Sequence, residues 1–145
     1  MDKNGWVSID FLMASLLILL TIPSLVSIIE DRINTVNSVQ EISEARVLAE
    51  NLAEDIEMVY SGGRGCSIVF KLPANVSNKH YKITINSTGV YVSFLGKIGT
   101  AHITPMTISN GKYDSYVLLE PNKTYNISNI KDEHDRMKII IKQIW

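Results

Sequence analysis

The sequence predicts an α+β fold in which one long N-terminal helix packs against a small antiparallel β-sheet head. Three observations support this prediction. Residues 6–29 are almost entirely apolar, residues 30–60 keep apolar side chains at three- and four-residue spacing, and apolar and polar residues alternate after residue 66. The chain has 145 residues, which is enough for a single domain with one modest hydrophobic core.

The apolar segment from Trp6 to Ile29 contains 24 residues and only one charged side chain, Asp10. As a helix it would be about 36 Å long, and the hydrocarbon core of a bilayer is about 30 Å thick. A helix that is apolar on every face over this length does not suit the core of such a small soluble domain. We therefore expect this segment to lie in lipid or among identical neighbours.

Two residues interrupt the apolar segment. Asp10 lies near its start, and a carboxylate costs about 2.5–3.5 kcal/mol at the centre of a membrane helix and less near its ends. Its carboxylate is expected either to find a partner or to lie at the depth of the lipid headgroups. Pro23 has no backbone N–H, so it predicts a kink or a locally loosened helix.

The apolar pattern continues beyond the length that a membrane needs. The recurring apolar residues are Ile29, Ile33, Val36, Ala45, Leu48, Leu52, Ile56 and Val59. Ser61-Gly62-Gly63 then predicts the end of the helix. We expect one helix from about Trp6 to Tyr60, amphipathic over residues 30–60. An ordinary secretory signal is disfavoured because no small-residue cleavage site follows the apolar core.

The chain starts with Met1-Asp2-Lys3-Asn4-Gly5 and continues with Trp6-Val7-Ser8-Ile9-Asp10-Phe11. A short hydrophilic leader that ends in glycine, followed by serine and an acidic residue, resembles the class III signal peptide of archaeal type IV pilin-like proteins. The resemblance covers about a dozen residues. Trp6 stands where the family has glutamine, and Asp10 where it has glutamate.

This resemblance implies that a prepilin peptidase cuts between Gly5 and Trp6, removing residues 1–5 and leaving the helix attached. Asp10 would then meet the new α-amino group of a neighbouring subunit. The implied partners are other pilin subunits in a homo- or hetero-polymer, the prepilin peptidase, the pilus assembly platform and, before assembly, the cytoplasmic membrane. The departures at Trp6 and Asp10 favour a minor pilin of a cell-surface filament.

Two other functions share some of these features. A permanently anchored extracellular binding or adhesion module would have the same helix but would need neither Gly5, Ser8 nor Asp10. A secreted enzyme whose site forms only in the folded chain is the weakest of the three hypotheses, since the sequence has no catalytic motif.

The head is expected over residues 61–145, with the amphipathic helix of residues 30–60 packed on it. The predicted strands are Cys66–Leu72, Tyr81–Asn86 and Val90–Leu95, and, on weaker patterns, His102–Ile108, Tyr113–Glu120, Tyr125–Ile130 and Met137–Ile144. Asn86-Ser87-Thr88-Gly89 predicts a hairpin with positive φ at the glycine, and Asn110-Gly111 predicts a second hairpin. Together these patterns indicate an antiparallel sheet of about five to seven strands.

Four N-x-S/T sequons, at Asn75, Asn86, Asn122 and Asn126, all lie in the predicted head. None lies before residue 75. Their position modestly favours an extracellular, N-glycosylated head.

The charge pattern is asymmetric although the net charge is −1, and it does not suggest nucleic-acid binding. Residues 30–57 contain eight acidic residues and two arginines, and residues 61–145 contain eleven Lys and Arg but five Asp and Glu. The basic head of one copy could therefore contact the acidic stem of another. The alternative is two separately solvated surfaces.

No residue type in a suitable spacing predicts a catalytic, cofactor or metal site, and we expect a non-enzymatic protein without cofactors. Cys66 is the only cysteine, so it is expected to act as a small hydrophobic residue. His80, His102 and His134 are scattered, and Asp132-Glu133-His134-Asp135 is expected to be a solvated turn.

Overall fold

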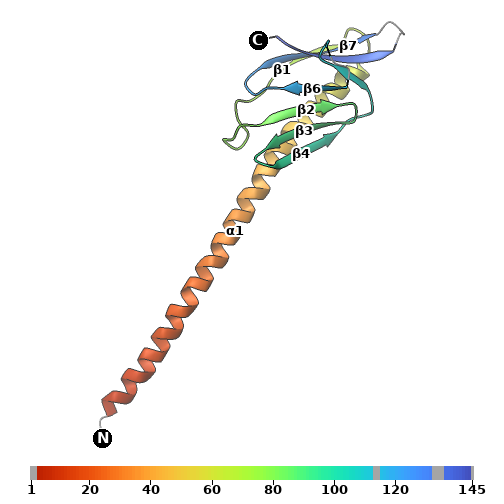
Figure 1. Cartoon of the computed structure of the whole chain (residues 1–145). Helices are drawn as coiled ribbons and strands as arrows, with labels where there is room; N and C mark the ends of the chain where they lie inside the picture. Colours follow the sequence, from red (N-terminus) through yellow and green to blue (C-terminus); the bar gives the residue numbers. More distant parts are fainter. Residues whose placement is uncertain (1–2, 113–114, 132–135, 145) are drawn as a thin grey trace. The chain divides into compact units, whose positions relative to one another are not determined.

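The computed structural model describes residues 3–112, 115–131 and 136–144, with side chains described from residue 9 onward. The elements are α1 (Lys3–Ser61), β1 (Ser67–Lys71), β2 (Lys82–Asn86), β3 (Gly89–Phe94), β4 (Lys97–His102), β5 (Thr107–Ser109), β6 (Tyr116–Leu119), β7 (Thr124–Lys131) and β8 (Met137–Gln143) (Figure 1). The chain separates into two units, Met1–Val39 and Gln40–Trp145. The second unit contains the last turns of α1 and all of these strands, and the predicted α+β class is confirmed.

The first unit is helical, and α1 continues without a break through Pro23. Proline lacks the backbone N–H that would donate to the carbonyl of Leu19, four residues earlier. Two hydroxyl groups donate to carbonyl oxygens on either side, from Thr21 to Ile18 at 3.0 Å and from Ser24 to Leu20 at 3.4 Å. The helix therefore lacks one backbone donor at Pro23 but is continuous there, and the kink or local loosening stays a prediction.

The helix ends where the sequence predicts, at Ser61. The N–H of Gly62 donates to the carbonyl of Met58 at 2.9 Å, and Gly63 has a left-handed φ of 75°. The last carbonyls of a helix have no partner within the helix. Asn129 of β7 supplies one, because its Nδ2 donates to the carbonyls of Val59 and Tyr60 at 3.2 and 3.1 Å. Asn129 is fully buried, so this contact joins the helix end to the interior of the head.

The strands form two sheets, so the prediction of a single antiparallel sheet was wrong. The strand orders are β1-β7-β8-β5 and β4-β3-β2-β6, each with four strands. The pairing of β5 with β8 is parallel, and the other pairings are antiparallel. The described residues form eight strands, more than the five to seven expected, mainly because β4 was not predicted.

Strand β4 escaped prediction because its inward positions are small. Gly99 and Ala101 are buried, whereas Ile98 is exposed, which reverses the usual sheet pattern. A Cβ atom on Gly99 would lie 2.6 Å from both the carbonyl carbon of Ala45 and the backbone nitrogen of Arg46. Glycine is required here because β4 lies directly on the backbone of α1.

Two turn predictions need correction. The hairpin between β2 and β3 is confirmed, with Asn86 paired to Gly89, but Gly89 is not among the residues with positive φ. Glycine is needed at residue 89 for another reason: a Cβ atom there would lie only 2.9 Å from the carbonyl oxygen of Ala101. Gly111 does have positive φ, but β5 and β6 belong to different sheets, so Asn110-Gly111 does not form a hairpin.

The helix and both sheets of the second unit share one hydrophobic core. The buried residues of α1 are Ala45, Ala49, Leu52, Ala53, Ile56 and Val59. Strands β2, β3 and β4 lie over this end of the helix (Figure 1). Ile29, Ile33 and Val36, by contrast, are exposed, so the expected apolar stripe of residues 29–59 does not join this core as a whole.

Candidate functional site: an uncovered apolar helix and a carboxylate clamp

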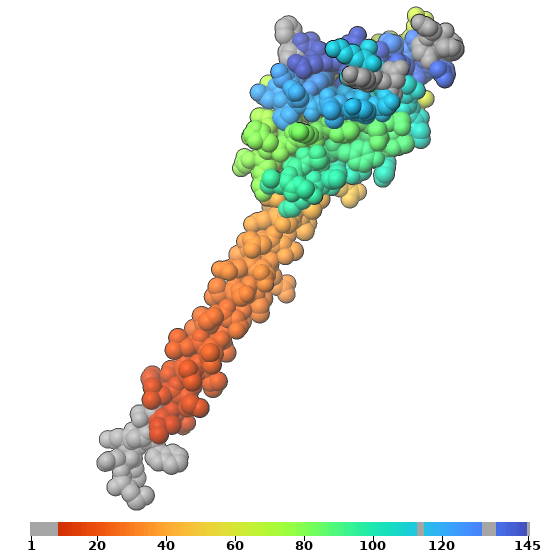
Figure 2. Space-filling view, in the orientation of Figure 1, coloured from red at the N-terminus to blue at the C-terminus, as the bar shows by residue number. Residues whose placement is uncertain are grey.

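The first unit exposes large apolar side chains along its whole described length. Between Ile9 and Val39 the large apolar side chains are 47–72% exposed. Figure 2 shows the side chains of this part of α1, drawn in red and orange, projecting from the helix. A contiguous apolar surface of this kind indicates an interaction with lipid or with another protein.

Among the described residues, one helix, Ile9–Ser61, is long and apolar enough to cross a membrane. Its apolar window is not buried within the chain, so packing in the molecule's own core does not explain its composition. The helix thus fits a membrane anchor or a signal sequence.

The residues of the predicted signal motif lie at the start of α1. Gly5, Trp6 and Ser8 fall within the helix, but the side chains of Trp6 and Ser8 lie outside the described part. The predicted leader begins with Met1 and Asp2, which also lie outside it, so cleavage after Gly5 stays a prediction. Asp10 is exposed and makes no ion pair or hydrogen bond within the part of the chain that the structure describes.

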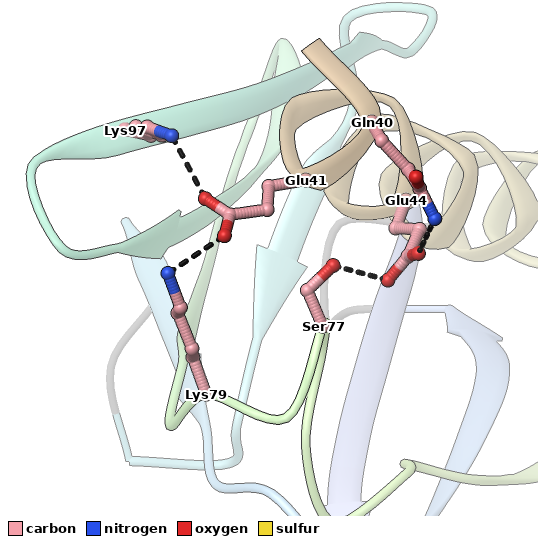
Figure 3. Close-up of polar contacts among 6 residues, drawn as sticks. All are labelled: Gln40, Glu41, Glu44, Ser77, Lys79 and Lys97. Carbon is pink, nitrogen blue, oxygen red and sulfur yellow. Dashed lines mark hydrogen bonds and ion pairs between the residues drawn. The ribbon is translucent and has the colours of Figure 1, made fainter. Parts of the chain in front are cut away.

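The second unit begins with a carboxylate clamp centred on Glu41 (Figure 3). One carboxylate oxygen of Glu41 lies 2.7 Å from Nζ of Lys79, and the other lies 2.8 Å from Nζ of Lys97. The Glu41 side chain is only 18% exposed. Because Lys79 precedes β2 and Lys97 begins β4, one helical carboxylate connects two separate segments of the head.

Glu44 lies one turn further along α1 and extends the clamp. Its carboxylate accepts a short hydrogen bond from the hydroxyl of Ser77 and another from Nε2 of Gln40 at 3.3 Å (Figure 3). Ser77 and Asn78 both have positive φ, and reciprocal backbone hydrogen bonds between Val76 and Lys79 close the turn. This strained turn places Ser77 and Lys79 against the helix.

These contacts keep both carboxylates ionised. Hydrogen bonds from Lys79 and then Lys97 lower the pKa of Glu41 below its usual value of 4.5. The hydrogen bond from Ser77, followed by that from Gln40, lowers the pKa of Glu44. The clamp therefore keeps its charges at neutral pH and into the mildly acidic range.

The clamp was not predicted from the sequence. Residues 30–57 were expected to form an acidic surface that another copy could contact, but the carboxylates of Glu41 and Glu44 bind residues of the chain's own head. The partners of Glu41 are 38 and 56 residues away in the sequence. No local pattern signals pairs at such a distance; only the fold brings them together.

The four sequons differ in their surroundings. Asn75 and Asn122 are exposed in connecting segments. Asn86 instead uses its Oδ1 to accept hydrogen bonds from the backbone N–H groups of Thr88 and Gly89 and from the Thr88 hydroxyl. Asn126 lies within β7, and its buried Oδ1 accepts no hydrogen bond from the residues that the structure describes.

The remaining candidate residues are not brought together. Cys66 is half-buried against Gly62. Within the described ranges, no group of three or more His, Cys, Asp and Glu residues could hold a metal ion. His134 and the rest of the quartet at 132–135 lie outside these ranges.

The chain was also compared with known proteins. No family model, curated protein or solved structure matches it.

Proposed function

We propose that this protein is a structural subunit, most consistent with a minor pilin, of a type IV pilus-like surface filament in archaea. In this proposal the chain waits in the cytoplasmic membrane, loses residues 1–5, and then enters a filament through its apolar helix. The head, residues 61–145, remains outside the cell. The archaeal assignment depends on the resemblance of the N-terminal motif.

The observation that supports this proposal is the uncovered apolar helix. Over residues 9–39, large apolar side chains are exposed around the helix and have no partner within the described chain. Removing apolar surface from water contributes about 25 cal/mol per Å², so this helix is stable only in lipid or among other apolar surfaces. Identical helices in a filament core supply such surfaces after the subunit leaves the membrane.

Asp10 has a defined role in this scheme. Cleavage after Gly5 creates an α-amino group at Trp6, and Asp10 of an adjacent copy would pair with it once both are removed from water. A partner of opposite charge offsets the cost of burying a carboxylate. The Pro23 position, where one backbone hydrogen bond is missing, would let the helix adjust between membrane and filament.

The clamp is assigned a mechanical role. Force on the helix during extraction has to reach the head, and Glu41 joins the helix to both Lys79 and Lys97 near the start of the second unit. Asn129 holds the other end of this helical stretch. Both contacts would keep the helix and head moving together.

The test is to sequence the N-terminus of the native protein from membranes and from a sheared filament fraction. We expect a chain that begins at Trp6 in both fractions. A matched Gly5→Val variant should retain Met1 and stay in the membrane, because the residue at the cleavage site has changed. Wild-type protein that keeps Met1 and never enters filaments would instead support a permanently anchored binding module. Soluble monomer that lacks the first thirty or so residues would exclude both functions.

A further inference from the structure

Strand β4 has an open edge. It lies at the end of the β4-β3-β2-β6 sheet and, among the described residues, pairs only with β3. Phe94 pairs with Lys97 across the two-residue turn, and the N–H of Ile103 donates to the carbonyl of Thr88 at 3.1 Å. Backbone groups alternate in direction along an antiparallel strand. The backbone N–H and C=O groups of residues 98, 100 and 102 therefore point away from β3.

A shallow groove of about 290 Å³ runs beside this edge, between β4 and α1. It is lined by Arg46, Glu50, Ala53, Glu54, Glu57, Thr100, Ala101 and His102. The lining has three glutamates and one arginine, so the groove is acidic. The Arg46 guanidinium binds Glu50 at 2.8 Å, and Glu57 accepts hydrogen bonds from Thr104. Glu54 is exposed and has no such contact within the described residues.

A complementary edge exists on the other sheet. The strands β1, β7, β8 and β5 contain four lysines and no acidic residue. Strand β1 is one of the two edge strands of this sheet, and Val69 and Lys71 on it are exposed. The N–H of Asn129 donates to the carbonyl of Cys66, and the N–H of Leu72 to that of Lys123. Residues 66 and 72 thus face β7, and the backbone groups of 67, 69 and 71 point outward.

We infer that the β1 edge of one copy adds to the β4 edge of the next copy, with Lys71 placed beside the acidic groove. The inference rests on the proposed function, because it requires neighbouring copies in an assembly. Main-chain hydrogen bonds between open edges supply affinity, and side chains beside them supply specificity. Since β1 and β4 are different surfaces, the contact is head-to-tail and can repeat without closing.

The directions of the backbone groups set the direction of the added strand. Residues 69 and 100 both point their backbone groups outward, and two such residues lie directly opposite each other only when the strands run antiparallel. Antiparallel pairing of Val69 with Thr100 also puts both side chains on the same face of the joined sheet. Lys71, two residues further along the same edge, remains beside the acidic groove that Thr100 lines.

Disulfide cross-linking of assembled full-length protein tests the inference. In a Cys66→Ala background, with Cys66→Ser as a second background if the first fails to fold, copies with Thr100→Cys are mixed with copies with Val69→Cys and oxidised. We expect a cross-linked dimer from the mixture and none from either variant alone. Ser115→Cys, an exposed position away from both edges, is the matched control in place of Thr100→Cys.

Charge exchange provides the second arm. Adding Glu54→Lys to the Thr100→Cys copy should lower the cross-link yield roughly fivefold, and adding Lys71→Glu to the Val69→Cys copy should restore it. Filaments that form without a 69–100 cross-link above the Ser115 control would overturn the inference and leave the proposed function intact. A chain that retains Met1 and forms no sedimenting assembly would overturn both.

Discussion

Gly99 of β4 rests on the backbone of Ala45 in α1, where a Cβ atom would lie 2.6 Å from the Ala45 carbonyl carbon. Ala45 itself is fully buried. The absence of a side chain at residue 99 and the small side chain at residue 45 let the strand and helix approach closely. This contact fixes β4, whose first residue, Lys97, also belongs to the clamp on Glu41.

Substitution at this contact should destabilise the head. Gly99→Ala forces either β4 or α1 to move, and overpacking of this kind costs about 1–3 kcal/mol. Chemical denaturation of the full chain in detergent, followed by the β-sheet signal, measures the loss. Thr100→Ala, on the half-exposed neighbouring position, should change the midpoint very little. Equal stability of the Gly99→Ala and wild-type proteins would contradict the close contact.

The clamp predicts that the folded protein loses stability in acid. Because the pKa values of Glu41 and Glu44 are lowered below 4.5 in the folded protein, their contribution to stability is complete above about pH 4.5. It is lost as the pH falls through the folded-state pKa values. Thermal unfolding of the full chain in detergent between pH 7 and pH 3 should show this loss.

The Glu41→Gln variant distinguishes the stability lost from the clamp from the stability that the rest of the protein loses in acid. This variant cannot form the ion pairs, so its stability should fall less steeply than that of the wild type below pH 4.5. Glu50→Gln removes only the exposed pair with Arg46 and is the matched control. An unchanged acid slope in Glu41→Gln would mean that Lys79 and Lys97 do not hold this carboxylate in solution.

Asn129→Ala should weaken the end of the helix. It removes the donor for the carbonyls of Val59 and Tyr60 within the core, and leaving such buried groups unsatisfied costs about 1–3 kcal/mol. Hydrogen exchange should increase in the last turn of α1, and the denaturation midpoint should fall. Ser128→Ala, the half-exposed neighbour on β7, provides the comparison. Wild-type exchange in the last turn of the Asn129→Ala protein would exclude the capping role.

If the head is glycosylated, Asn75 and Asn122 should carry the glycans. Both are exposed in connecting segments, whereas Asn86 is held by three hydrogen bonds and Asn126 lies within a strand. Glycopeptide mass spectrometry of native protein gives the occupancy at each site. Occupancy confined to Asn86 or Asn126 would show that access to the folded head does not govern modification.

The role of Pro23 can be tested by restoring the missing backbone donor. Pro23→Ala allows a hydrogen bond to the Leu19 carbonyl, and alanine favours a helix interior by about 3 kcal/mol over proline. We expect a stiffer helix and a lower filament yield. Leu19→Ala, which keeps the proline, controls for loss of packing. Unchanged yield and helical symmetry in Pro23→Ala would remove the proposed adjustment.

The sequence by itself determined the features that depend on local patterns. The apolar composition of residues 6–29 and the glycines after Ser61 were sufficient to predict one helix and its end, because helix formation and termination are decided by nearby residues. Alternation likewise predicted β2 and β3, where buried Ile83 and Ile85 are separated by polar neighbours. The periodicity of these elements is visible in the sequence because it depends on neighbouring residues alone.

Only the tertiary structure decided how the head is divided and joined to the helix. The inward residues of β4 are small because α1 lies against this strand. The pattern of β4 therefore indicates a strand only when the contact between Gly99 and Ala45 is known. The two sheets, the parallel β5–β8 pair and the clamp on Glu41 likewise depend on contacts between distant residues. Hydrophobic burial and ion pairing act between whatever surfaces the fold brings together, and no local spacing records which surfaces these will be.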